Sequence, residues 1–212
     1  MLGIVDYGRG NLFSITQALT HLGVEHALVS SVDMVAGCDR LILPGVGAFS
    51  DAMQGLRRTG LHGAVRNAID ARVPLLGICV GCQLLLEQGE EFGVHAGLGV
   101  IPGTVRRLRP PAENDKHRLR LPNIGWRHVK PTTQTGCLAD VDADGRDTFY
   151  FVHSYAPFPR EAEAIAAVTQ INGERVPVAV RRDRVYGVQF HPEKSGDAGL
   201  RLLHRFATTM NW

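Results

Sequence analysis

A strand-to-helix turn centred on Cys79 constrains the fold of this chain more than any other segment. Residues Val73–Ile78 form an apolar run typical of a buried strand, and residues Val80–Leu86 resemble the start of a helix. Cys79 lies between Gly77 and Gly81, whose missing Cβ atoms relieve the crowding of a sharp turn. This frame is the nucleophile-elbow pattern with sulfur in place of the serine oxygen. It predicts that Cys79 stands at a helix N-terminus, which favours a thiolate; the alternative is a small buried apolar residue.

A second segment supplies the partners that a nucleophilic cysteine needs. The apolar run Val185–Phe190 is typical of a strand, and His191, Pro192 and Glu193 follow it. A histidine can act as base and acid for a thiol, and a carboxylate can fix its tautomer and orientation. Because active sites of α/β sheets collect at the carboxyl ends of the strands, we predict a triad of Cys79, His191 and Glu193. Taken alone, His191 is explained equally well as a surface or core histidine.

Length and composition indicate an ordinary globular chain. It has 212 residues, of which 44% are hydrophobic and 21% charged, and this predicts one domain over residues 1–212. The net charge of only +2 argues against a nucleic-acid partner. The sequence shows no secretory signal and no membrane span. Its 4 cysteines do not make a disulfide framework, so we expect a cytoplasmic protein.

Strands and helices are expected to alternate in the first half of the chain. This rhythm predicts a parallel sheet covered by helices, with strands at 2–5, 24–30 and 40–43 and helices at 12–22, 48–59 and 61–72. Shorter strands are expected after Gly97, at 98–101, 104–108, 126–129, 148–155, 165–170, 177–182 and 185–190. We expect hairpin turns at 172–173 and 183–184, a loop over 109–121, and a closing helix over about 196–210.

Five segments together carry the motifs of a known family: Asp6–Leu12, Pro44–Phe49, Gly77–Gln83, Phe151–Tyr155 and His191–Ser195. Through them the chain resembles, over nearly its whole length, the class I (triad-type) glutamine amidotransferases. Among these it is most similar to the glutaminase subunits of imidazole glycerol phosphate synthases. The resemblance implies a three-layer α/β fold, with a central mixed, mostly parallel sheet flanked by helices and with additional antiparallel strands.

The resemblance also implies a reaction and a partner. Cys79 would form a thioester with L-glutamine, and the released ammonia would pass to a (β/α)₈-barrel cyclase subunit in histidine biosynthesis. This implies a heterodimer that needs no cofactor and no metal. By similarity, the oxyanion is bound by backbone N–H groups of Val80 and of Val46 or Gly47. Glutamine is bound by Gln83, Glu91, Ser154 and Tyr155, and the cyclase is contacted by Asn11, Trp126 and Lys194.

Two departures from the family pattern leave alternatives open. Cys82 stands where methionine is usual, and Arg127 stands where asparagine is usual. The resulting Cys79-x-x-Cys82 is a redox motif in its own right, so a thiol-disulfide oxidoreductase is the chief alternative. Zinc binding and a non-catalytic binding module are further alternatives. Within the family, the glutaminase could also serve purine, folate, tryptophan or pyridoxal phosphate synthesis.

Overall fold

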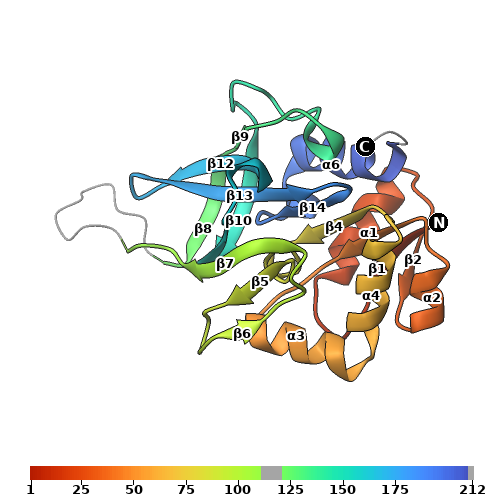
Figure 1. The fold of residues 1–212 in the computed structure, drawn as a ribbon. Coiled ribbons are helices and arrows are strands. Elements are labelled where there is room, and N and C mark those ends of the chain that lie inside the picture. The colour runs from red at the N-terminus through yellow and green to blue at the C-terminus, as the bar shows by residue number, and fades with distance from the viewer. Residues whose placement is uncertain (111–120, 210–212) are drawn as a thin grey trace.

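The computed structural model describes residues 1–110 and 121–209, and most of the loop expected at 109–121 lies outside them. Within this part of the chain, the largest sheet has the strand order β2-β1-β3-β4-β14-β13-β12-β9 (Figure 1). The first five strands of that order pair in parallel and the last three in antiparallel fashion, which confirms a mixed, mostly parallel sheet. In chain order these strands are β1 (Leu2–Val5), β2 (His26–Val29), β3 (Arg40–Leu43), β4 (Leu75–Ile78), β9 (Lys130–Pro131), β12 (Ile165–Ile171), β13 (Glu174–Arg182) and β14 (Val185–Val188).

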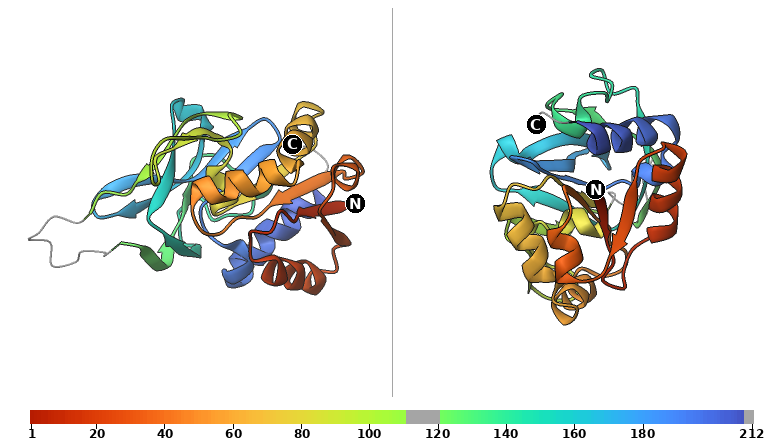
Figure 2. Two further views of the ribbon diagram at one scale, coloured as in Figure 1. Left: turned by 90° about the horizontal axis from the view of Figure 1, so that it is seen from below. Right: turned by 90° about the vertical axis from the view of Figure 1, so that its right-hand side faces the viewer.

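Helices cover both faces of this sheet, as the three-layer prediction requires (Figures 1 and 2). Helices α1 (Leu12–His21) and α6 (Gly196–Thr208) pack together on one face. On the other face, α4 (Leu61–Asp70) packs against α2 (Val32–Ala36) and α3 (Phe49–Arg58). Helix α2 was not predicted, because a helix of 5 residues is too short to show apolar periodicity.

Two smaller sheets stand beside the central one. One has the order β11-β7-β5-β6 and the other pairs β10 with β8. Their strands are β5 (Leu86–Gly89), β6 (His95–Ala96), β7 (Ile101–Arg107), β8 (Asn123–His128), β10 (Thr148–His153) and β11 (Tyr155–Pro159). The short 3₁₀ helices are η1 (Gly136–Leu138), η2 (Ala162–Ala164) and η3 (Pro192–Lys194).

The structure makes three corrections to the expected elements. The expected strands at 98–101 and 104–108 are replaced by the single strand β7, which absorbs Gly103 (φ 141°) in a bulge against β5. The expected strand at 148–155 is divided at Ser154, where the chain leaves β10 for β11 in another sheet.

The helix after Cys79 is the third correction. It is α5 (Val80–Gln83), a single turn, and the chain then enters β5. The backbone N–H groups of Leu98 and Val100 donate hydrogen bonds to the carbonyls of Leu84 and Leu85, at 2.8 and 2.9 Å. The apolar run therefore continues as irregular chain and strand rather than as helix.

Both predicted hairpin turns are confirmed. Asn172 and Gly173 adopt φ values of 50° and 75° between β12 and β13, the left-handed pair that a two-residue hairpin favours. Asp183 has a φ of 51° in the turn between β13 and β14. These turns bring β14, the strand before His191, back beside β4, the strand before Cys79.

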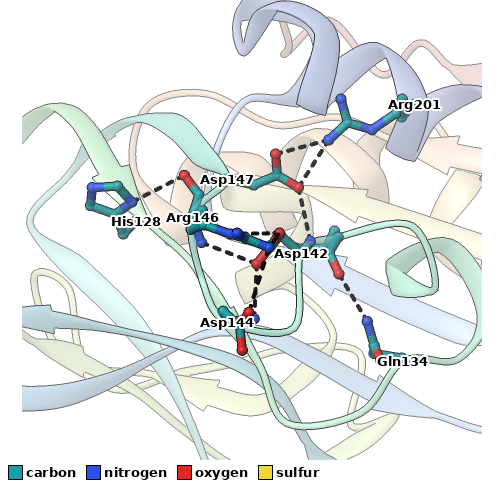
Figure 3. A network of polar contacts seen from close by, with 8 residues as sticks. His128, Gln134, Asp142, Asp144, Arg146, Asp147 and Arg201 are labelled. Atoms are coloured by element: carbon teal, nitrogen blue, oxygen red, sulfur yellow. Dashed lines mark hydrogen bonds and ion pairs between the residues drawn. The ribbon is translucent and has the colours of Figure 1, made fainter.

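A polar network fixes the loop that leads into β10 (Figure 3). The Asp147 carboxylate accepts hydrogen bonds from Arg201 of α6, at 2.8 Å, and from the backbone N–H of Asp142, at 2.9 Å. Arg146 donates to Asp142 at 2.8 Å within the same loop. The network ties the start of β10 to α6, and β10 in turn supports the segment after β14.

Candidate active site

Cys79 occupies a strained turn that its neighbouring glycines make possible. Its φ of 56° and ψ of −111° are unusual for a residue with a Cβ atom. A Cβ on Gly77 would lie 2.6 Å from the Gly81 carbonyl oxygen, and a Cβ on Gly81 would collide with the Leu43 carbonyl. The structure therefore has the sharp elbow that the sequence predicts. Strain of this kind is typical of functional sites.

Hydrogen bonds hold both the backbone and the ring of His191 in place. Its backbone N–H donates to the Tyr150 carbonyl of β10 at 2.9 Å, and its own carbonyl accepts from the Ser195 hydroxyl at 2.6 Å. The ring Nδ1 lies 2.8 Å from Oε1 of Glu193, whose side chain is fully buried. This contact fixes Nδ1 as the donor and leaves Nε2 facing away from the carboxylate.

The electrostatics of His191 favour a charged ring. Burial alone lowers its pKa, but the Cys79 sulfur and the Glu193 carboxylate outweigh burial and raise the pKa to about 10. Nε2 is buried and has no partner with good hydrogen-bond geometry among the described residues, although the sulfur is close enough to influence the ring. An imidazolium with an unoccupied Nε2–H is suited to giving a proton to a bound molecule.

Replacing Glu193 with glutamine should flatten the dependence of stability on pH. The pKa of His191 is about 10 in the folded state against 6.5 ordinarily, so the native protein keeps a proton that the unfolded chain loses. The free energy of unfolding gained from this proton should be complete below pH 6.5 and lost as the pH rises through about 10. Without the carboxylate the loss should be smaller and should end at a lower pH.

Urea unfolding between about pH 6 and pH 10 measures this effect. The matched control is Glu163→Gln, which removes an exposed carboxylate. An unchanged slope in Glu193→Gln would contradict the role given to this carboxylate.

A cleft of about 550 Å³ opens in front of Cys79 and His191. Its wall includes every predicted site residue except Glu193 and Trp126. The Glu193 side chain is buried behind His191. The predicted residues that the cleft brings together are Asn11, Val46, Gly47, Cys79, Val80, Gln83, Glu91, Ser154, Tyr155, His191 and Lys194. The wall is completed by four residues that were not predicted as site residues: Ser14, Pro122, Val152 and His153.

The predicted oxyanion segments face each other. The Val80 N–H donates to the Gly45 carbonyl at 3.3 Å, so this donor is engaged in the present structure. Gly45 has no room for a side chain, since a Cβ there would lie 2.6 Å from the Gly81 nitrogen. Gly47 has a φ of 85°, a conformation that favours glycine.

Two of the predicted glutamine-binding side chains also hold the protein together. Gln83 is buried and its Nε2 donates to the Tyr155 carbonyl at 3.1 Å and to Oε1 of Gln189 at 2.9 Å. Glu91 accepts the Phe49 N–H at 2.9 Å, at the start of α3. Both side chains nevertheless line the cleft.

Of the residues predicted to face a partner, Asn11 and Lys194 line this cleft and Trp126 lies outside it. Asn11 caps α1 by accepting the Ser14 N–H at 3.4 Å, and Lys194 belongs to η3. Trp126 is 51% exposed on β8, with an edge-on contact to Tyr150 across a centroid distance of 6.1 Å. Exposed Ile124 and Val152 extend this apolar surface on the paired strands β8 and β10.

The Cys82 thiol, which the redox alternative requires, is buried and does not line the cleft. The cysteines are free, and Cys82 is fully buried, with its sulfur 2.7 Å from the position of a Cβ on Gly187. Burial, and to a lesser degree Cys79, raise the pKa of the Cys82 thiol well above its ordinary value. Among residues 1–110 and 121–209, no group of three or more His, Cys, Asp and Glu side chains is placed to hold a metal ion. None of the helices in that part of the chain has the length and apolar character of a membrane-crossing segment.

Comparison with known proteins gives the same family as the motifs. The family model for glutamine amidotransferase class-I matches residues 3–210. The imidazole glycerol phosphate synthase subunit HisH of Geobacillus thermodenitrificans is 43% identical over 206 residues, which cover 97% of this chain and 94% of that protein. HisH of Salinibacter ruber is 44% identical over 207 residues, which cover 98% and 94%.

Solved structures show the same fold at lower sequence identity. A glutamine amidotransferase crystal structure matches with a TM-score of 0.68 at 23% identity, over 98% of this chain and 99% of that one. The structure of PurLQS from Thermotoga maritima matches with a TM-score of 0.72 at 17% identity, over 97% and 96%. The chain belongs to the class I glutamine amidotransferase family.

Proposed function

We propose that the chain is the glutaminase subunit of an imidazole glycerol phosphate synthase. The observation that carries this proposal is the position of His191, with Nδ1 on Glu193 and a free Nε2 in a cleft that also holds Cys79. The near full-length similarity to HisH proteins supports the choice of this amidotransferase over others of its class. The cytoplasmic location and a single domain over residues 1–212 stay predictions.

The geometry suggests how the residues divide the chemistry. The Cys79 thiolate attacks the side-chain amide carbon of L-glutamine, and His191 gives its Nε2 proton to the departing ammonia. The resulting γ-glutamyl thioester is hydrolysed by a water molecule that loses its proton to the now neutral Nε2. Glutamate leaves, the thiolate is restored, and Glu193 keeps the ring oriented throughout.

The hydrogen bonds that Gln83 already makes leave only one of its side-chain atoms available to the substrate. Both hydrogens of its Nε2 are used, on Tyr155 and on Gln189, so only Oε1 is left. An amide oxygen accepts hydrogen bonds, and we therefore assign Gln83 to the α-ammonium group of glutamine rather than to its α-carboxylate.

Substituting proline for Val46 should lower glutamine hydrolysis by about 10²- to 10³-fold, the usual cost of losing one oxyanion donor. With Val80 bonded to the Gly45 carbonyl, the peptide between Gly45 and Val46 has to turn before both N–H groups can bind an oxyanion. Proline at this position has no N–H to contribute. Steady-state glutamate release measures the effect, and Val46→Ala, which keeps the N–H, should lose far less. Equal rates in Val46→Pro and the unaltered protein would exclude this donor.

The chemistry of ammonia indicates what kind of partner the chain needs. Ammonia released into water at neutral pH is protonated and diffuses away, so a glutaminase of this kind should dock its open cleft on a subunit that consumes ammonia. We propose a (β/α)₈-barrel cyclase, contacted by Asn11, Trp126 and Lys194. The test is co-purification with the cyclase of the same host, followed by glutamate release when the phosphoribulosyl substrate is added. Failure of the two chains to associate would overturn this choice of partner.

A further inference from the structure

Gln189 is a buried polar residue that the sequence analysis did not single out. It follows β14, two residues before His191, and its side chain has no exposure to solvent. Its Nε2 lies 3.7 Å from the Cys79 sulfur, and its Oε1 lies 2.9 Å from Nε2 of Gln83. A buried amide is costly unless it is hydrogen-bonded, so these contacts determine which way the side chain points.

The orientation of the Gln189 amide follows from a backbone carbonyl two contacts away. The Tyr155 carbonyl can only accept, so the Gln83 atom that faces it is the donor Nε2. The same Nε2 also faces Gln189, which must therefore present its acceptor Oε1 to Gln83. The remaining group of Gln189, an N–H donor, is then directed at the sulfur of Cys79. Reversing either amide would set two donors or two acceptors against each other.

The Tyr155 carbonyl is itself held in place. It accepts a second hydrogen bond, of 2.9 Å, from Nδ1 of buried His153, whose Nε2 lies 2.9 Å from Nδ2 of Asn123. An amide NH₂ can only donate, so the ring is neutral and carries its proton on Nδ1. Burial, partly offset by the hydrogen bond to Tyr155, lowers the pKa of His153 to about 4, in agreement with this tautomer.

Several titratable groups face Cys79 among the described residues. His191, Tyr7 and Cys82 interact with it electrostatically, and Glu91 and Lys194 line the same cleft. Burial raises the pKa of the Tyr7 hydroxyl and of the Cys82 thiol, so both are neutral near neutral pH. His191 therefore contributes a charge beside the sulfur, and Gln189 adds an uncharged donor.

We propose that Gln189 is a positioning residue for Cys79, whose N–H, aimed by Gln83 and the Tyr155 carbonyl, favours the thiolate over the thiol. A thiolate is the better acceptor of the two, so a fixed donor shifts the balance toward it. The inference rests on the proposed function only for its biological role. The contact with the sulfur can be tested without glutamine and without a partner.

The test is the rate of alkylation of Cys79 by iodoacetamide as a function of pH, followed by mass spectrometry of the peptide that contains Cys79. Gln189→Glu keeps an acceptor for Gln83 but places a carboxylate oxygen beside the sulfur. The midpoint of the alkylation profile should rise by about one pH unit, which makes alkylation about tenfold slower below the midpoint. Gln189→Met, which fills the space with no donor, should shift the midpoint in the same direction by less.

The control is Gln134→Glu, which alters an exposed glutamine whose Nε2 donates to the Val141 carbonyl at 3.1 Å (Figure 3). Its alkylation profile should coincide with that of the unaltered chain. A midpoint that stays in place in both Gln189 variants would overturn the inference, and so would a uniform loss of rate at every pH. Glutamate release by the unaltered chain with its cyclase, measured separately, tests the proposed function.

Discussion

Replacing Cys79 with serine should lower glutamine hydrolysis by at least about 10⁴-fold, because removal of a catalytic nucleophile leaves only binding and oxyanion effects. A serine hydroxyl gives up its proton far less readily than a thiol, so the elbow would hold a weak, neutral nucleophile. The measurement is glutamate release by the complex with the proposed cyclase. The same complex should still form its product when ammonium salts replace glutamine.

The control for this substitution is a cysteine outside the cleft. Cys38 is buried near the start of the chain, with its sulfur 3.2 Å from the Met34 carbonyl. Cys38→Ser should leave glutamate release unchanged. A Cys79→Ser variant that keeps more than about 1% of the rate would rule out the covalent mechanism.

Gly81→Ala should destabilise the fold by about 3 kcal/mol, a large effect for the addition of one methyl group. The new Cβ would collide with the Leu43 carbonyl and lie 3.1 Å from the Pro44 carbonyl carbon. Neither backbone atom can rotate away as a side chain can, so the end of β3 or the elbow has to move. The same movement would displace the segment that carries Val46. Urea unfolding measures the loss of stability.

Gly63→Ala is the matched comparison within the same chain. Gly63 lies on the exposed side of α4, and a Cβ there meets nothing within 4 Å. Alanine in a helix interior is favoured over glycine by about 0.5–1 kcal/mol, so this variant should be slightly more stable. Equal stabilities of the two variants would contradict the close packing described at the elbow.

Much of the site could be predicted because its parts are local in sequence. The two glycines around Cys79 indicated the elbow, and His191 and Glu193 are only two residues apart. The order of strands and helices indicated that both segments end at the same edge of a sheet. The family resemblance supplied most of the other residues that line the cleft, which periodicity and spacing alone do not identify.

The remaining features depend on contacts between distant parts of the chain. Helix α5 ends at Gln83 because the backbone N–H groups of Leu98 and Val100 donate to the next carbonyls. The local sequence gives no sign of these distant contacts. Gln189 could have been noticed as one polar residue within an apolar strand. Its contacts with Gln83 and Cys79 appear only when β14 lies beside β4.

The place of β14 in the sheet has a consequence for the timing of activity during synthesis. Among the described strands it is the last to be made, yet it lies inside the sheet, between β4 and β13. A nascent chain that still lacks β14 has an unpaired β4 edge and a cysteine without its imidazole. The chain should therefore not hydrolyse glutamine while it is still being synthesised. Fragments that end before His191 should be inactive for the same reason.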